Sequence, residues 1–273
     1  MNIQASRTVV SEPALILRED IGAVAVLTLN RPETRNVLSE AMLAALNESF
    51  TAIEGDRKVR ALVLAAAGPV FSAGHDLKQM TRHRADADGG RAYFSALMQT
   101  CSTTMQRIGE LPQPVIAAVE GTATAAGSQL VASCDLAIAS AAAKLGTSGI
   151  NVGLFCSTPI VAVSRKVGRK HAMELLLTGD LISAAEAHRI GLVNRVVEVG
   201  GARAAAIELA KKLVAKSRAA IRYCKPAFYR QLEMGLAEAY RYTSDVMVEN
   251  MMERDTAEGI AAFIEKRPPD WDR

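Results

Sequence analysis

The chain has 273 residues, of which 49% are hydrophobic and 22% are charged. This length suits one α/β core with appended helices, and this composition excludes a disordered chain. The net charge of +3 comes from 32 basic and 29 acidic residues without a long block of one sign, so nucleic acid is not an expected partner.

The cysteine spacing and the hydropathy of the chain bear on its compartment. Cys101, Cys134, Cys156 and Cys224 are widely separated, form no Cys-x-x-Cys pair and have no metal-ligand spacing with the histidines. We therefore expect no metal site and a reducing, cytoplasmic location. The first residues lack the apolar core of a signal peptide, and no stretch approaches the roughly 18 consecutive apolar residues of a membrane helix. We expect no membrane partner.

Apolar runs and helical patterns alternate along the first half of the chain. Ser39 is a suitable N-cap, and apolar residues recur at helical spacing from Met42 to Ile53. The runs at 60–66 and 114–119 are continuously apolar, which is typical of strands buried on both faces of a parallel sheet. The expected elements are strands at 14–17 and 23–29, a helix at 39–55, a strand at 60–66, a polar loop at 81–90, a helix at about 91–109 and a strand at 114–119.

The second half continues with a strand-turn-helix rhythm and ends in helices. The rhythm indicates βαβ units. The alanine-rich, charge-laced segments after Gly200 predict a helical C-terminal part. The expected elements are a helix at about 126–133, strands at 136–139 and near 145, helical units near 158–177 and 183–189, a strand at 193–197, and helices near 202–216, 218–235, 236–249 and 254–265.

Two small-residue turns each follow an expected buried strand. Residues 71–78 read Phe-Ser-Ala-Gly-His-Asp-Leu-Lys, and residues 119–135 read Val-Glu-Gly-Thr-Ala-Thr-Ala-Ala-Gly-Ser-Gln-Leu-Val-Ala-Ser-Cys-Asp. Small residues let backbone N–H groups converge without obstruction by side chains, and donors aimed at a developing negative charge stabilise it. The turns resemble the paired oxyanion-hole segments of the crotonase, or enoyl-CoA hydratase/isomerase, superfamily.

Two later stretches, 151–154 and 177–187, support the same resemblance, which covers about residues 15–266. The runs at 123–135 and 151–159 are most similar to the branch called enoyl-CoA hydratase domain-containing protein 3. Three motifs in family order are not expected by chance.

The resemblance implies a fold and an assembly. The expected fold is α/β, with a crotonase-like spiral core of stacked β-β-α turns that binds acyl-CoA at residues 1–200. A helical C-terminal region at 201–273 is expected to close the site and mediate oligomerisation. The resemblance also implies an acyl-CoA thioester as the partner and a homotrimer or a dimer of trimers. Coenzyme A enters as part of the substrate, and no prosthetic group is expected.

The resemblance also assigns site residues. The backbone N–H groups of His75 and Ala126 are expected to form the oxyanion hole, and the His75 imidazole is a candidate proton shuttle. The positions expected to border the coenzyme A groove are Arg35, Asn36, Val37, Leu38, Ser72, Gly74, Asp76, Leu77, Lys78, Phe263 and Lys266.

The proton-transfer positions depart from the family pattern. Hydratases of this family carry glutamates where this chain has Gln129 and Gly149. Neither residue transfers a proton usefully, so ordinary hydration is expected to be weak. Cys156 is a candidate nucleophile or redox-sensitive residue because its loop approaches the acyl pocket in relatives. Alternatives are a non-catalytic acyl-CoA-binding or regulatory protein, or a different thioester reaction such as hydrolysis, decarboxylation or isomerisation.

Overall fold

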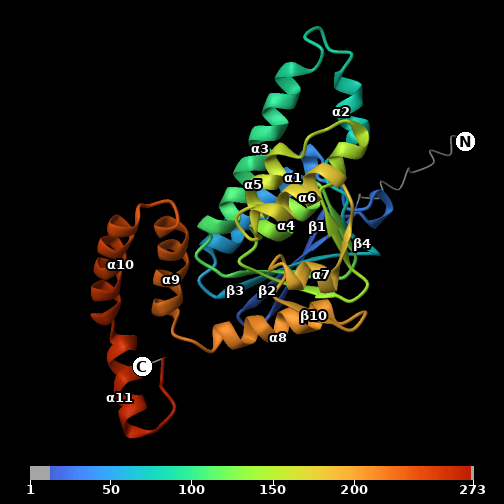
Figure 1. Cartoon of the computed structure of the whole chain (residues 1–273). Coiled ribbons are helices and arrows are strands. Elements are labelled where there is room, and N and C mark those ends of the chain that lie inside the picture. Colours follow the sequence, from blue (N-terminus) through green and yellow to red (C-terminus); the bar gives the residue numbers. More distant parts are fainter. Residues whose placement is uncertain (1–12, 272–273) are drawn as a thin grey trace, which may run out of the picture.

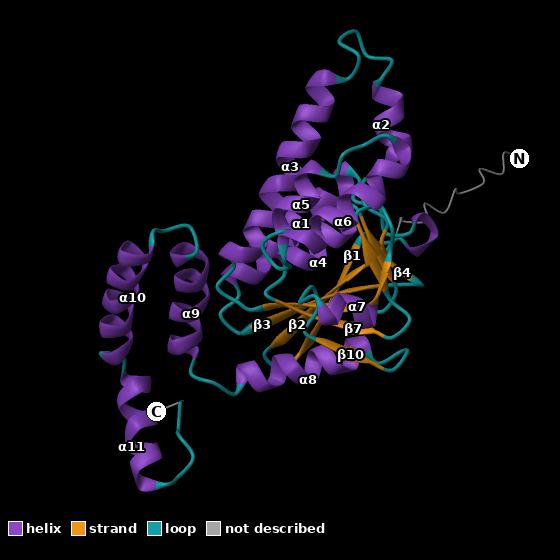
Figure 2. Cartoon of the chain, viewed as in Figure 1, coloured by secondary structure: helices purple, strands orange, loops and turns teal. Residues whose placement is uncertain are grey.

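Two sheets form the centre of the molecule, as a computed structural model that describes residues 13–271 shows (Figures 1 and 2). The larger sheet has the order β1-β2-β3-β5-β7-β10, and all its neighbours are parallel except the antiparallel pair β1 and β2. Its strands are β1 Ile16–Ile21, β2 Val24–Leu29, β3 Ala61–Ala66, β5 Val115–Val119, β7 Leu136–Ser140 and β10 Arg195–Val197. Strand β5 is buried throughout and β3 at every residue but its last, as their continuous apolar runs predict.

A smaller sheet takes up the chain after the buried strands. It has the order β4-β6-β8-β9, with β4 Val70–Ser72, β6 Thr122–Thr124, β8 Lys144–Gly146 and β9 Ile182–Ser183. The chain passes from β3 to β4, from β5 to β6 and from β7 to β8, and it therefore alternates between the sheets. The expected α/β fold is confirmed, while β4 and β6 lie where the sequence predicted only turns.

Helices cover both faces of the larger sheet. The buried apolar residues form two clusters. One, which includes Leu46 of α1 and Leu97 of α3, lies on one face of the sheet. The other, which includes Val63 of β3 and Ala206 of α8, lies between the opposite face and α8. The helices are α1 Glu40–Gly55, α2 Leu77–His83, α3 Arg91–Glu110, α4 Ala126–Ser133, α5 Ser157–Val163, α6 Arg169–Thr178, α7 Ala184–Arg189, α8 Ala202–Val214, α9 Arg218–Gln231, α10 Leu236–Met251 and α11 Arg254–Glu265, with short 3-10 turns η1 Pro32–Thr34 and η2 Ser148–Val152. Within residues 13–271, no helix combines the length and apolar character needed to cross a bilayer.

Local capping explains two differences from the predicted elements. The expected polar loop at 81–90 begins inside α2, because the Asp76 carboxylate accepts hydrogen bonds from the backbone N–H groups of Lys78 and Gln79 and starts a helix there. The expected unit at 158–177 is two helices, α5 and α6, and Gly168 is the N-cap of the second. The spacing of apolar residues alone does not reveal where one short helix ends and the next begins.

The C-terminal helices divide into two groups by their packing. Helix α8 lies on the larger sheet through Ala206, Ile207 and Ala210 and so belongs to the core by contact. Helices α9, α10 and α11 extend to one side of that core (Figure 1). Large apolar side chains remain exposed on them within the single chain, among them Phe228, Leu232, Leu236, Tyr240, Met247, Met251, Met252, Ile260, Phe263 and Ile264.

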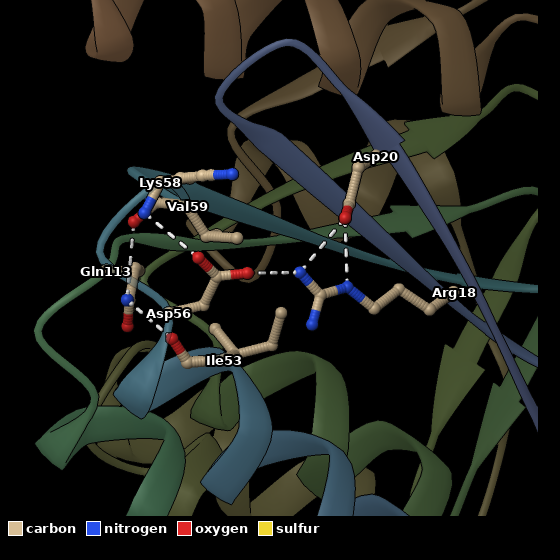
Figure 3. A network of polar contacts seen from close by, with 7 residues as sticks. All are labelled: Arg18, Asp20, Ile53, Asp56, Lys58, Val59 and Gln113. Carbon is tan, nitrogen blue, oxygen red and sulfur yellow. Dashed lines mark hydrogen bonds and ion pairs between the residues drawn. The ribbon is translucent and has the colours of Figure 1, made fainter.

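A polar network fastens the edge of the sheet to the end of α1 (Figure 3). The Arg18 guanidinium on β1 contacts both carboxylate oxygens of Asp20 and lies 2.7 Å from an oxygen of Asp56, the C-cap of α1. The buried amide of Gln113 donates to the carbonyl of Ile53 at 2.9 Å. These contacts tie the segments that lead into β3 and β5 to the end of α1.

Candidate functional site

The two predicted turns are packed against each other. A Cβ atom added at Gly127 would lie 2.3 Å from the carbonyl oxygen of Ser72, a distance that real side chains do not adopt. Gly74 has a φ of +86°, and an added Cβ would lie 3.0 Å from the Cβ of Ala125 and 3.2 Å from the nitrogen of Ala126. Glycine at both positions therefore permits the close approach of the backbones.

Backbone strain marks the second turn. Ala125, the N-cap of α4, has φ 52° and ψ −121°, a conformation that costs a non-glycine residue about 1–3 kcal/mol. Helix α4 therefore begins at Ala126, and the N–H group of this first residue has no acceptor within the helix. In the described part of the chain, no acceptor takes the N–H of Ala126 or that of His75. The turns thus hold two donors without partners among residues 13–271.

The His75 side chain is held in one tautomer. Its Nδ1 lies 3.3 Å from the carbonyl oxygen of Leu38. Because a carbonyl only accepts hydrogen bonds, Nδ1 carries the proton and Nε2 has a free lone pair. That Nε2 is buried and has no hydrogen-bond partner among residues 13–271. Burial lowers the pKa of His75 below its ordinary value, so the ring is neutral near pH 7.

The side chains of two residues predicted to border the coenzyme A groove hold the turns together from inside. The Asn36 side chain donates to the carbonyl oxygens of Ala67 and Val70 at 2.9 and 2.8 Å, and its oxygen accepts from the N–H of Arg31. The Ser72 hydroxyl donates to the carbonyl of Asn36 at 2.8 Å. Both residues are fully buried, so their side chains position the turns and do not face a ligand.

The remaining predicted groove residues fall into three settings. Arg35, Leu77 and Lys78 have exposed side chains beside the first turn, and Val37 is half-buried there. Leu38 is buried and donates its N–H to the carbonyl of Gly74 at 2.7 Å, while Asp76 caps α2.

Phe263 and Lys266 are not brought to the same place within one chain. Both belong to the end of α11, which Figure 1 shows on the far side of the core from α2. Phe263 is 85% exposed.

Gln129 lies one helical turn after Ala126 on α4 and is 4% exposed. Its Oε1 is 4.0 Å from the Sγ of Cys101 on α3. Burial raises the pKa of the Cys101 thiol to about 11, so this neighbour stays protonated near pH 7. An amide beside a protonated thiol can orient a ligand, but neither group is a base.

Gly149 lies in η2 against Cys156. A Cβ atom added at Gly149 would be 2.6 Å from the Cys156 Sγ and 2.7 Å from the carbonyl oxygen of Leu154. The N–H of Gly149 donates to the Cys156 sulfur, but desolvation is the larger effect and raises the pKa of the thiol. Cys156 is therefore a packed, protonated thiol whose sulfur takes the space that a side chain at residue 149 would need.

A polar pair beside these positions includes Thr124, which the sequence reasoning did not consider. The hydroxyl oxygens of Thr124 and Ser148 are 2.7 Å apart, and each residue directly precedes one of the unusual positions, Ala125 and Gly149. The Ser128 hydroxyl also joins strands β6 and β8, because it donates to the carbonyl of Ala123 on β6 and accepts from the N–H of Gly146 on β8. No local sequence pattern signals these contacts, because their partners lie on different turns of the chain.

Comparison with known proteins gives consistent matches. Residues 19–273 match the family model described as enoyl-CoA hydratase/isomerase. The rat protein named enoyl-CoA hydratase domain-containing protein 3, mitochondrial, is 44% identical over 96% of this chain and 85% of its own length. A crystal structure of enoyl-CoA hydratase from Mycobacterium smegmatis has a TM-score of 0.90 and 50% identity, covering 96% of this chain and 100% of that chain. The crystal structure of human enoyl-CoA hydratase domain-containing protein 3 has a TM-score of 0.89 and 43% identity, covering 94% and 100% of the two chains. The resemblance inferred from the motifs is confirmed.

The same comparison overturns one expectation from the sequence. The rat, mouse and human relatives are named as mitochondrial, so the expected cytoplasmic location is wrong. Unpaired cysteines suit any reducing compartment and therefore do not distinguish one from another. The first residues, on which the expectation about targeting segments also rested, lie outside the described residues.

Proposed function

Because the chain belongs to the enoyl-CoA hydratase/isomerase family, we propose that it binds an acyl-CoA thioester and stabilises the thioester enolate with the backbone N–H groups of His75 and Ala126. The observation that carries the proposal is the close packing of the two turns, together with these two N–H groups, which no acceptor among residues 13–271 takes. Removing one oxyanion-hole donor in other enzymes costs about 10²–10³ in kcat, so two donors supply a large share of a rate enhancement.

The reaction at this site is proposed to differ from ordinary hydration. Hydration needs one group to deprotonate water and another to protonate the α-carbon. Gln129 supplies an amide, and Gly149 supplies no side chain. The neutral His75 imidazole, with Nε2 as its acceptor, is the proton carrier that we favour, through a ring movement that exposes this buried atom. With a single proton-transfer group, we expect slow hydration or another reaction through an enolate, such as isomerisation or decarboxylation.

A second candidate is a binding protein without catalysis. Two features favour it: the thiols of Cys101 and Cys156 have raised pKa values, and the amide of Gln129 is not a base. Such a protein would bind acyl-CoA in the groove without converting it and would have a regulatory role.

The coenzyme A portion is proposed to lie along the first turn, with no prosthetic group. Arg35 and Lys78 present exposed cationic side chains there, which suit phosphates. Phe263 and Lys266 lie on α11, away from this turn (Figure 1). We propose that they approach the groove of a neighbouring copy in a homotrimer or a dimer of trimers.

Turnover and binding of crotonyl-CoA by the wild type and by Gln129→Glu test the proposal, with Gln231→Glu on α9 as the matched control. Only Gln129 is changed at the site, because Gly149 has no room for a side chain. We expect calorimetry to show binding and the wild type to hydrate crotonyl-CoA slowly. The hydration rate should rise about 10²-fold in Gln129→Glu and should not change in Gln231→Glu.

Two results would contradict the proposal. Wild-type hydration at ordinary enzyme rates, about 1–10³ s⁻¹, would show that other groups carry the protons. No binding of any CoA ester would refute the thioester site itself. Binding without turnover of a panel of CoA esters would select the non-catalytic candidate.

A further inference from the structure

The hydroxyl pair of Thr124 and Ser148 lies at the same edge of the smaller sheet as the proposed oxyanion hole. Strands β4, β6 and β8 are parallel neighbours, so their carboxyl ends meet at one edge. His75 follows the end of β4, Ala126 follows the end of β6, and Ser148 follows the end of β8. The pair joins the last two of these ends, and Thr124 precedes the Ala126 donor by two residues.

The pair retains hydrogen-bonding capacity for a ligand. Two hydroxyls have two O–H donors, and the 2.7 Å bond between them uses one. Among residues 13–271, no acceptor takes the other O–H. Both residues are half-buried, so a ligand can reach this O–H, and the bond within the pair polarises it and strengthens it as a donor.

The neighbouring Thr147 shows the contrast with a purely structural hydroxyl. Its side chain is fully buried and donates to the carbonyl oxygen of Leu175 at 2.9 Å. That hydroxyl therefore has its acceptor inside the protein, whereas one O–H of the pair at Thr124 and Ser148 remains available.

The charge at this edge favours an anionic ligand. Residue 129 is an amide and residue 149 is a glycine, so neither position places a carboxylate beside the pair. The Asp76 carboxylate in the first turn accepts from the N–H groups of Lys78 and Gln79, which directs it to the start of α2. Neutral donors bind a carboxylate by charge-assisted hydrogen bonds, and glutamates in the same place would repel it.

The absence of a base restricts how a thioester enolate can form. Removal of an α-proton needs a base, and so does the addition of water to a double bond. Loss of CO₂ from a carboxylate on the α-carbon needs no base, because the electron pair of the broken C–C bond itself forms the enolate. A site with an oxyanion hole, an amide at Gln129 and no side chain at Gly149 suits this route.

We propose that the pair of Thr124 and Ser148 binds the free carboxylate of a 2-carboxyacyl-CoA thioester of the malonyl type, which is then decarboxylated. The inference rests on the proposed thioester site and names its substrate class. The bond between the α-carbon and the carboxylate breaks, CO₂ leaves, and the electron pair passes to the thioester oxygen in the oxyanion hole. The α-carbon then takes a proton from water, so malonyl-CoA and water give acetyl-CoA and bicarbonate.

Turnover of malonyl-CoA and methylmalonyl-CoA, followed by chromatography of the CoA esters, measures this reaction. Calorimetry with acetyl-CoA measures the thioester site alone, because acetyl-CoA lacks the carboxylate. The double variant Thr124→Val with Ser148→Ala removes both hydroxyls with little change in size. A hydrogen bond to a charged group corresponds to about 10- to 100-fold in affinity, so we expect kcat/KM for malonyl-CoA to fall by this factor and acetyl-CoA affinity to stay unchanged.

Matched variants separate the hydroxyl chemistry from effects on folding. Thr124→Ser keeps both hydroxyls and should keep the wild-type kcat/KM. Ser244→Ala on α10 removes a hydroxyl that donates to the carbonyl of Tyr240, and it should leave turnover unchanged. Ser148→Ala alone leaves one hydroxyl and should lose less than the double variant, and it takes the place of the double variant if that one does not fold.

The outcomes are distinct. A fall in malonyl-CoA turnover with unchanged acetyl-CoA binding supports the carboxylate site. A wild type that binds acetyl-CoA but converts neither ester overturns it while the thioester site stands. Unchanged malonyl-CoA turnover in the double variant also overturns it, and so does an equal loss of turnover and acetyl-CoA binding, which marks a structural role. No binding of any CoA ester refutes the proposed function and this inference with it.

Discussion

Removal of the Lys225 ammonium tests how α9 is held on the core. Lys225 is 6% exposed, and its Nζ donates to the carbonyl oxygens of Ile108 and Gln113 at 2.7 and 2.9 Å. It also pairs with a carboxylate oxygen of Asp135 at 2.8 Å. Burial lowers the pKa of Lys225, and the Asp135 carboxylate opposes that effect. The ammonium thus joins α9 to the end of α3 and to the start of β7.

The expected cost of Lys225→Met follows from what it leaves behind. Asp135 keeps hydrogen bonds from the N–H of Val115 and the hydroxyl of Tyr229, but its buried charge loses the cation. Breaking one partner of a buried ion pair costs about 3–5 kcal/mol. For a domain of this size, that lowers Tm by about 2–4 °C per kcal/mol.

Urea unfolding at pH 7 measures this loss. Fluorescence of Trp271, the single tryptophan, reports on the C-terminal helices because its indole donates to the carbonyl of Ala215 at the end of α8, and circular dichroism reports on the whole fold. Lys212→Met on the exposed side of α8 is the control for loss of a lysine. The second variant, Lys225→Met with Asp135→Asn, should recover part of the loss because no carboxylate remains unpaired. A loss below about 1 kcal/mol in Lys225→Met would refute the buried pair.

Three further changes probe the site. Ala125→Gly should raise the free energy of unfolding by about 1 kcal/mol in a urea titration, since glycine adopts the positive φ without strain; a decrease would contradict the backbone geometry. Gly149→Ala should cost about 1–3 kcal/mol by overpacking against Cys156, and an unchanged Tm would show that the loop yields freely. His75→Ala should weaken the acid dependence of Tm. The folded pKa of His75 is lowered, so wild-type stability is complete above about pH 6.5 and falls as pH drops through the folded pKa. Equal slopes of Tm between pH 7.5 and 5.5 in both proteins would exclude this effect.

Much of the fold was predictable from local patterns. The cap at Ser39, whose hydroxyl accepts from the N–H of Met42, and the apolar spacing up to Ile53 define α1 within the chain segment itself. Continuous apolar runs identified β3 and β5 for the same reason, because burial on both faces demands them at every position. The order of small-residue motifs likewise indicated the family, since each motif is a local backbone requirement.

The sequence by itself determined the long helices α1 and α3, the buried strands and the two turns, because these depend on residues near one another in the chain. Only the tertiary structure decided what the individual side chains contact. Asn36 and Ser72 use their side chains between the turns, Cys156 fills the space beside Gly149, and Phe263 stands apart on α11. These outcomes depend on which distant segments meet, and packing of side chains from different elements sets that.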